Sequence, residues 1–271
     1  MTQESLFKHG RYTLGWIKDF YEQAGIWWGD DPQAEGVDEE RARCVDRLCG
    51  PGPLRVLDLG AGTGTNAAAI ASHGHSVVAV ELSTSRANFA KELAKQPHKG
   101  SLTVIEGDFY TVELDGRFDV VCLWETFGLG ADADQRRLLA RIVEHWLAPG
   151  GSILMDVYHP AGPVRDAGKE WRLSPLKGVP GSVEMFERCH YDAVQGRWID
   201  EWQPVATPEK ALAQSVRCYT PADLCLLLEG AGLALKRVEI DGSAVDFTSN
   251  LINIATSFLK TYAYVVQLQA I

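Results

Sequence analysis

The sequence predicts an α/β fold built around a doubly wound, mostly parallel sheet. Between residues 54 and 158, short apolar runs typical of buried strands alternate with stretches of helical periodicity. A glycine-rich turn joins the first of these strands to the first helix. The 271 residues are enough for one large domain of this kind with added segments. Because helices cross over between parallel strands, the alternation implies a sheet covered on both faces.

The elements of this region follow one another without long loops. The predicted strands are Leu54–Leu59, Ser76–Glu81, Leu102–Glu106, Phe118–Trp124 and Gly151–Tyr158. The predicted helices are Thr65–His73, Ser85–Lys95 and Asp132–Leu147. We therefore expect the main domain to extend over residues 54–271, with residues 54–158 as its core.

An aromatic-rich segment precedes the first strand. Its apolar residues recur at roughly helical spacing, at Leu6, Phe7, Trp16, Ile17, Phe20 and Tyr21. Glycine and proline in Gly25–Gly36 predict a loop, and the charged segment Asp38–Cys49 predicts a further helix. The run Gly50–Pro53 ends this segment. We expect residues 1–53 to form an N-terminal helical lid.

The pattern changes after residue 158. Alternation in Val183–His190 and Arg197–Pro204 predicts an antiparallel hairpin, with its turn at Asp192–Gly196. We expect residues 159–218 to form an antiparallel insert that covers the substrate. A helix over Pro221–Glu229 and two closing strands, Leu233–Ile240 and Thr261–Ala270, complete the prediction.

Composition excludes several classes of function. The formal net charge of -10 disfavours non-specific nucleic-acid binding. The sequence contains no long apolar run and no signal-peptide pattern, so neither a membrane span nor secretion is expected. The six cysteines are scattered and form no Cys-x-x-Cys pair, and no cluster of ligand residues predicts a metal. We expect a reduced, cytoplasmic protein.

The turn after the first strand is the clearest chemical signal. Residues 56–65 read VLDLGAGTGT, with Gly60, Gly62 and Gly64 at alternate positions. Glycine lets a ligand approach the backbone, and the N-terminus of the following helix suits an anionic group. Glu81 ends the second strand, where an acid can accept the hydroxyls of a ribose. The glycine spacing departs from the G-x-G-x-x-G of dinucleotide sites.

Several motifs in this order resemble class I S-adenosylmethionine-dependent methyltransferases. They are VLDLGAGTG (56–64), Glu81, Gly107–Phe109, FDVVCLWETFG (118–128) and LAPGG (147–151). The resemblance implies a Rossmann-like sheet of seven strands, the last antiparallel and inserted beside the fifth. It also implies S-adenosyl-L-methionine as cofactor, held by Asp58, Gly60, Gly62, Gly64, Glu81, Leu82, Asp108, Phe109 and Trp124.

The chemistry of these residues agrees with the resemblance. Loop N–H groups can bind the carboxylate of the methionine part, and Asp58 with the carbonyls near Trp124 can accept from its ammonium. The resemblance assigns Asp108 to the adenine amino group and Phe109 to the face of the ring.

We expect the acceptor to lie beyond the carboxyl ends of the strands, under the two covering segments. Aromatic rings can enclose an apolar pocket and attract cations. The predicted substrate-binding residues are Tyr12, Trp27, Trp28, Phe127, Tyr158 and Trp202. The alternative is that these rings only attach the covers to the core.

The sequence does not assign a catalytic base. A neutral amine acceptor needs none, whereas a hydroxyl or carbon acceptor usually does. The predicted catalytic residues are His159, Glu125 and Tyr21, with Tyr12, His9 and Glu170 as further candidates.

We predict methyl transfer to the N, O or C atom of a small molecule, in a natural-product pathway. The insert and residues 218–233 resemble, more loosely, small-molecule methyltransferases that include sugar N-methyltransferases. WETF stands where methyltransferases acting on nucleobase or glutamine nitrogens have Asn-Pro-Pro-Tyr, which disfavours nucleic-acid and protein substrates. The alternatives are a nicotinamide-dependent oxidoreductase and a non-catalytic S-adenosylmethionine-binding protein. We expect no nucleic-acid or membrane partner, and a homodimer is left open.

Overall fold

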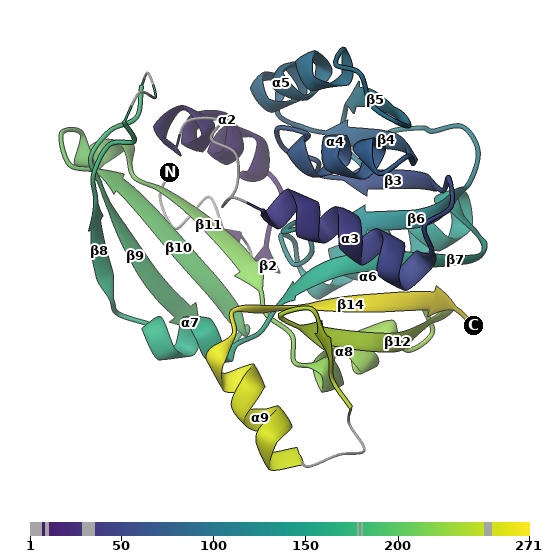
Figure 1. Ribbon diagram of the computed structural model, residues 1–271. Helices are drawn as coiled ribbons and strands as arrows, with labels where there is room; N and C mark the ends of the chain where they lie inside the picture. Colours follow the sequence, from purple (N-terminus) through teal and green to yellow (C-terminus); the bar gives the residue numbers. More distant parts are fainter. Residues whose placement is uncertain (1–6, 9–10, 29–35, 178, 180, 247–250) are drawn as a thin grey trace.

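A computed structural model describes residues 7–8, 11–28, 36–177, 179, 181–246 and 251–271 of the chain. These residues form a large central sheet covered by helices, with a smaller antiparallel sheet beside its carboxyl-end edge (Figure 1). None of the described helices combines the length and apolar character needed to cross a membrane.

The central sheet has eight strands in the order β13-β12-β14-β7-β6-β3-β4-β5. The parallel strands are β3 (Arg55–Leu59), β4 (Ser76–Glu81), β5 (Ser101–Glu106), β6 (Phe118–Leu123) and β7 (Leu147–Tyr158). β14 (Ala263–Ala270) is antiparallel and lies between β7 and β12 (Leu233–Ile240). This confirms the expected antiparallel strand beside the fifth parallel strand, which is β7. The expected count of seven is too low, because the two-residue strand β13 (Ser243–Ala244) extends the edge.

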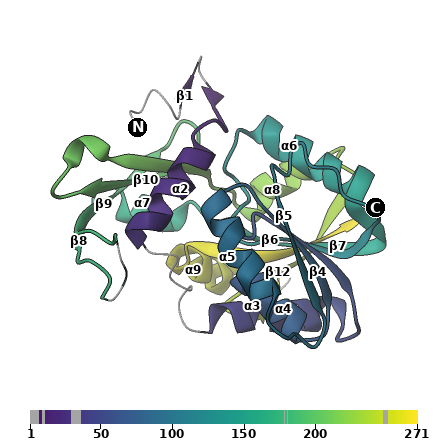
Figure 2. The same ribbon diagram turned by 90° about the horizontal axis from the view of Figure 1, so that it is seen from above.

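Neighbouring residues of the central strands face opposite hydrophobic cores. In β3, Val56 packs with the cluster under one layer of helices and Leu57 with the cluster under the other. The first layer contains α3 (Val37–Cys49) and α4 (Thr65–Ser72), and the second contains α6 (Asp132–Arg141) and α8 (Pro221–Leu228). Figure 2 shows these two layers on either side of the sheet. Burial on both faces explains why the strand sequences are almost wholly apolar.

The strand order reverses between β3 and β6. From β3 the chain proceeds to β4 and β5 on one side, and then returns to β6 on the other. In open α/β sheets, ligands bind at such a switch point, outside the carboxyl ends of the strands. Helix α5 (Thr84–Ala94) begins at the same edge, after β4.

The N-terminal segment contains a short hairpin, β1 (Phe7–Lys8) with β2 (Arg11–Tyr12), followed by α2 (Ile17–Trp28). The prediction that Gly25 begins a loop is therefore wrong. Phe20, Ala24 and Trp27 are buried on one face of α2, and this burial outweighs the helix cost of a glycine. Both views show α2 between the small sheet and α5 (Figures 1 and 2), whereas α3 packs on α4.

The insert is larger than the predicted hairpin. It forms a four-stranded sheet in the order β11-β10-β9-β8. Its strands are β8 (Glu170–Leu173), β9 (Met185–Asp192), β10 (Arg197–Pro204) and β11 (Leu212–Arg217), so β9 and β10 are the predicted hairpin. Helix α7 (Ala161–Asp166) precedes this sheet, and α9 (Leu251–Lys260), also not predicted, packs beside α7. Residues of β2, α2 and the insert share one apolar cluster, which joins the covering segments to each other.

Candidate functional site

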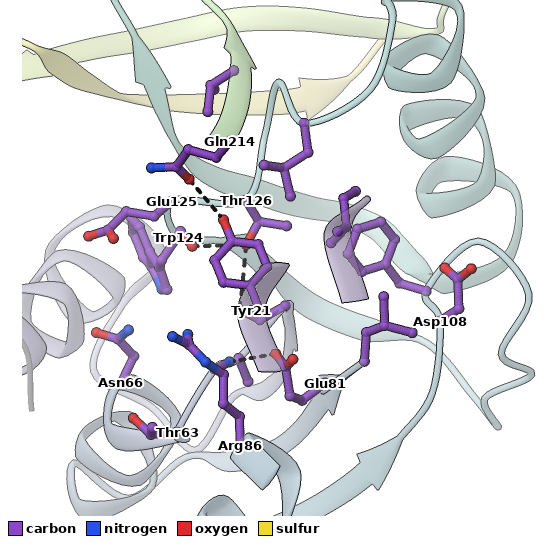
Figure 3. Close-up of a pocket in the computed structure, with 18 of the residues that line it drawn as sticks. Tyr21, Thr63, Asn66, Glu81, Arg86, Asp108, Trp124, Glu125, Thr126 and Gln214 are labelled. Atoms are coloured by element: carbon purple, nitrogen blue, oxygen red, sulfur yellow. Dashed lines mark hydrogen bonds between the residues drawn. The ribbon is translucent and has the colours of Figure 1, made fainter. Parts of the chain in front are cut away.

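A cavity of about 330 Å³ lies at the switch point, between the carboxyl ends of the strands and helix α2 (Figure 3). Its walls come from α2, the glycine loop, the ends of β4, β5 and β6, and strand β11 of the insert. The residues that line it are Leu14, Ile17, Tyr21, Gly60–Thr63, Thr65, Asn66, Glu81, Leu82, Arg86, Asp108–Tyr110, Trp124–Thr126, Leu129, Tyr158, Gln214 and Val216.

The glycine loop turns tightly against the rest of the site. Gly60 has φ +73°, and a Cβ there would lie 2.6 Å from Thr126 Oγ1. Gly64 has φ +81°, and a Cβ there would lie 2.6 Å from Ala90 Cβ of α5. Glycine at 60 therefore allows close approach to the turn after β6, and glycine at 64 lets α4 and α5 pack together.

Glu81 ends β4 and is held by backbone donors. Its Oε2 accepts from the Gly62 N–H at 2.8 Å, and its Oε1 accepts from the Ser83 N–H at 2.7 Å. Burial raises the pKa of this carboxyl, which is 7% exposed. Each carboxylate oxygen keeps a further lone pair, so Glu81 can accept from two neighbouring hydroxyls of a ligand.

Asp58 lies beneath the loop and is almost completely buried. Burial raises the pKa of its carboxyl to about 7. Its Oδ2 receives no hydrogen bond from any residue that the structure describes. A buried acceptor without a donor is costly, so this oxygen is suited to a donor brought by a ligand.

The end of the cavity next to β5 is more apolar. Leu82, Phe109 and Tyr110 line it together with Asp108. Asp108 Oδ1 accepts from the Tyr110 N–H at 2.8 Å, which fixes the carboxyl in the turn after β5. A carboxylate beside apolar and aromatic side chains suits a flat heterocycle that carries an amino group.

The turn after β6 carries Trp124, Glu125 and Thr126 to the cavity. Glu125 has φ +53°, uncommon for a residue with a side chain, and its carboxylate pairs with Arg41 of α3 at 2.6 Å. Arg41 also pairs with Asp156 at 2.8 Å, and burial raises the pKa of Asp156 to about 6. Glu125 is thus a paired carboxylate at the rim of the site.

Helix α2 contributes Tyr21, whose side chain points into the cavity (Figure 3). The guanidinium of Arg86 lies 5.1 Å from the centre of its ring. The hydroxyl donates to Gln214 Oε1 of β11 over 3.4 Å. Burial raises the pKa of the phenol above its usual range, so Tyr21 stays protonated at neutral pH.

The structure brings many of the predicted residues together at the cavity. They are Gly60, Gly62, Glu81, Leu82, Asp108, Phe109 and Trp124 of the predicted cofactor set, with Glu125, Tyr21 and Tyr158 of the acceptor side. Asp58 and Gly64 lie behind the loop and do not line the cavity.

His159 does not reach the cavity. Its ring packs against Phe258, with ring centres 5.1 Å apart, and its Nδ1 accepts from the Ala161 N–H at 3.3 Å. Burial lowers the pKa of this imidazole. The expected position of His159 at the site is therefore corrected, because the residues after β7 turn away to pack beneath α9.

Several predicted substrate residues are also placed elsewhere. Phe127 packs on Tyr219 in the core, and Trp27 is buried in the cluster beneath α2. Tyr12 donates to Asp192 at 2.8 Å, and Trp202 Nε1 donates to Asp200 at 2.8 Å. Phe127 thus belongs to the core of the main domain, whereas Tyr12, Trp27 and Trp202 pack in the cluster that joins the covering segments to each other.

Glu170 does not line the cavity and pairs with Arg188 on the insert sheet. His9 and the side chain of Trp28 lie outside the described residues.

Sequence reasoning missed several residues of the cavity, among them Arg86, Asn66, Tyr110 and Gln214. Arg86 and Asn66 are polar residues in the first turns of helices, a pattern that normally indicates solvent exposure. Tyr110 directly follows the predicted motif, so a wider motif window would have found it. Gln214 lies in a strand that was not predicted.

Known proteins share this fold and sequence pattern. Residues 56–151 match the family described as methyltransferase domain. The cypemycin N-terminal methyltransferase of a Streptomyces species is 36% identical over 189 residues, which cover 69% of this chain and 75% of that protein. The CcbJ methyltransferase of Streptomyces caelestis has a similar structure, with a TM-score of 0.71 and 24% identity over 95% of this chain and 98% of that chain.

The glycopeptide N-methyltransferase MtfA, solved with S-adenosyl-L-homocysteine, gives a TM-score of 0.58 at 24% identity, covering 89% of this chain and 92% of that chain. The likeness to the solved structures shows the fold. The cypemycin enzyme shows the family of this chain, because the two sequences are sufficiently identical over most of both proteins. The chain therefore belongs to the class I S-adenosylmethionine-dependent methyltransferases.

Proposed function

We propose that the cavity holds S-adenosyl-L-methionine along the glycine loop. Glu81 would accept from the ribose hydroxyls, and Asp108 with Phe109 would hold the adenine. The carbonyl groups near Trp124 would accept from the ammonium of the methionine part, and the Asp58 carboxylate behind the loop would supply the balancing negative charge. The donor-free Asp58 Oδ2 supports this fit, since a buried carboxyl oxygen without a donor leaves the site incomplete without a ligand.

We further propose a small-molecule amine as the methyl acceptor. The cofactor supplies a methyl group on a cationic sulfur, and the C–N bond forms as the C–S electron pair returns to sulfur. The observation that carries the choice of nitrogen is the set of ionisable side chains around the cavity. No histidine of the described residues lines it, Glu125 is paired with Arg41, and burial keeps Tyr21 and Tyr158 protonated.

A hydroxyl acceptor needs a base to remove its proton, whereas an amine attacks with its own lone pair. The residues of the site would then act by positioning the acceptor, which supplies much of the rate in a displacement of this kind. The names of two relatives, an N-terminal and a glycopeptide N-methyltransferase, support nitrogen as the methylated atom. The acidic net charge supports a small molecule over a nucleic acid.

Calorimetry with S-adenosyl-L-homocysteine tests the cofactor site. We expect Glu81→Ala to weaken binding by about 10- to 100-fold, as expected for the loss of hydrogen bonds to a carboxylate. Glu92→Gln is the control, because Glu92 is exposed on α5 and pairs with Lys95. Equal affinity in the Glu81 variant and the wild type would refute the assignment of the ribose site.

Methyl transfer from radiolabelled cofactor to matched panels of small amines and alcohols tests the acceptor class. We expect label in the amines only. Transfer to alcohols alone would overturn the choice of nitrogen. Binding of the cofactor without transfer to any member of either panel would favour the non-catalytic alternative. The family assignment favours methyl transfer over the nicotinamide-dependent alternative.

A further inference from the structure

One face of the insert sheet looks onto the cavity and carries buried polar groups. Asp200 of β10 lies directly opposite Gln214 of β11, so their side chains share a face of the sheet. Gln214 and Val216 of this face line the cavity. Asp200 lies behind Gln214 and is 1% exposed.

The hydrogen bonds around Asp200 have only one possible direction. Trp202 Nε1 donates to Asp200 Oδ2 at 2.8 Å, and an indole N–H is a donor only. This oxygen is therefore an acceptor. Gln214 Nε2 donates to the same oxygen at 3.2 Å. The amide of Gln214 thus has its nitrogen toward Asp200 and its oxygen toward the cavity side.

A second acid, Glu187, lies against the Asp200 side chain. Asp200 Oδ1 is buried and has no N–H or hydroxyl donor among the described residues. The carboxyl of Glu187 on β9 is hydrogen-bonded to the Asp200 side chain, which requires a proton between the two groups. Burial raises the pKa of both carboxyls, that of Asp200 to about 7. The hydrogen bond raises the pKa of Asp200 and lowers that of Glu187, so the shared proton belongs to Asp200. A proton on Oδ1 leaves Oδ2 an acceptor for Gln214.

The orientation of Gln214 in turn fixes the hydroxyl of Tyr21. The Tyr21 hydroxyl has a single hydrogen, which it donates to Gln214 Oε1 over 3.4 Å. Its ring is held by Arg86, 5.1 Å from the ring centre, and by Phe20, with ring centres 5.1 Å apart. Figure 3 shows this hydrogen bond between Tyr21 and Gln214, two residues that line the cavity. The free lone pair of the oxygen is then available to a ligand.

We propose that Asp200 and Gln214 are positioning residues that make the Tyr21 hydroxyl a hydrogen-bond acceptor toward the bound acceptor. An amide turned the other way would donate to Tyr21 and direct the tyrosine hydrogen into the cavity. The observed orientation favours acceptors that bring N–H groups, and in particular amines that carry a positive charge before or after methylation. This inference rests on the proposed function and assigns residues of the insert to its selectivity.

Sinefungin provides a probe that does not require the natural acceptor. This cofactor analogue carries an amino group at the place of the transferable methyl, and that group is a protonated N–H donor at neutral pH. S-adenosyl-L-homocysteine has no such donor there. The ratio of the two dissociation constants, measured by calorimetry, therefore reports the hydrogen-bond acceptors on the acceptor side of the site.

We expect wild-type protein to prefer sinefungin. Gln214→Met removes the amide at similar volume, and Asp200→Asn lets the amide of Gln214 turn. Each substitution should reduce the preference for sinefungin about tenfold, which corresponds to the loss of one hydrogen bond to a charged group. The affinity for S-adenosyl-L-homocysteine should change by no more than about twofold. Glu201→Gln is the matched control, because Glu201 is the next residue of β10, lies on the other face and pairs with Arg188.

An unchanged preference in Gln214→Met, with normal binding of S-adenosyl-L-homocysteine, would overturn the inference. Gln214→Met also decides the matter if Asp200→Asn does not fold, because Gln214 is on the cavity wall and not in the core. Failure of the wild type to bind S-adenosyl-L-homocysteine would instead refute the proposed function, so the two failures are distinguishable.

Discussion

Among single residues, the buried Asp58 carboxyl is the one that we expect to couple cofactor binding to pH. Burial raises its pKa to about 7, so it holds a proton at lower pH. A bound ammonium would favour the ionised form. We therefore expect affinity for S-adenosyl-L-homocysteine to rise as the pH increases from about 5 to about 8, with release of a proton on binding.

Calorimetry in two buffers of different ionisation enthalpy measures the released proton. Asp58→Asn should remove the pH dependence, and a wild-type affinity that is constant over this range would contradict the role of Asp58. The stability of the free protein depends on pH in the opposite sense. Asp58 ionises at a lower pH in the unfolded chain than in the folded protein. Asp58 therefore reduces stability as the pH rises from about 4 to about 7.

Position 60 requires glycine for two reasons: its backbone has a positive φ, and Thr126 leaves no room for a Cβ. We expect Gly60→Ala to destabilise the protein by about 3 kcal/mol, since the new Cβ would add overpacking to the cost of a positive φ. Gly168 has a similar φ of +82° but open space around it, so Gly168→Ala should cost only about 1 kcal/mol. Urea denaturation measures both, and equal losses would show that the contact with Thr126 does not matter.

Among the elements, α2 is fastened to α5 by one carboxylate. Glu22 accepts from the Thr84 N–H at 2.6 Å and from Ser85 Oγ at 2.8 Å, at the N-terminus of α5. A negative charge is favourable there because of the helix dipole. The two contacts hold α2, with Tyr21, over the cavity.

We expect Glu22→Gln to speed release of S-adenosyl-L-homocysteine by about fivefold, the equivalent of about 1 kcal/mol of helix-end interaction. The thermal midpoint should change little, because the apolar contacts of α2 remain. Stopped-flow displacement measures the rate, with Asp19→Asn on the exposed side of α2 as the control. An unchanged rate would mean that α2 does not limit release.

In the molecule as a whole, Arg197 joins the insert to the central domain. It is 2% exposed and donates to the carbonyls of Gly128, Leu129 and Gly130 at 2.9 to 3.2 Å. It also donates to Ser215 of the neighbouring strand. The segment 128–130 leads from the turn after β6 to α6. Arg197 therefore fixes the position of the insert relative to the cavity.

We expect Arg197→Met to reduce the free energy of unfolding by at least about 3 kcal/mol, because several buried carbonyls lose their donor. Arg188→Met on the same sheet should cost less than about 1 kcal/mol, since its partners are partly exposed. Chemical denaturation compares the two. Similar losses would indicate that the insert is held by apolar packing alone.

The cofactor side of the site could be predicted from local sequence. The glycine loop, Glu81 and the Asp108 turn each lie within a few residues of a strand end, and the chemistry of that end is fixed by the strand–helix alternation. The same alternation predicted the parallel strands and their helices, because buried strands and crossover helices have distinct periodicities.

Only the tertiary structure decided the acceptor side. Tyr21 and Gln214 are 193 residues apart, and no local pattern relates them. His159 and Phe127 follow strand ends as Glu125 does, but packing turns them into the core. The sequence by itself thus determined the fold class and the cofactor loop, where each residue's role depends on its neighbours in the chain. Packing of α2 and the insert decided which of their side chains line the cavity, since those contacts join distant segments.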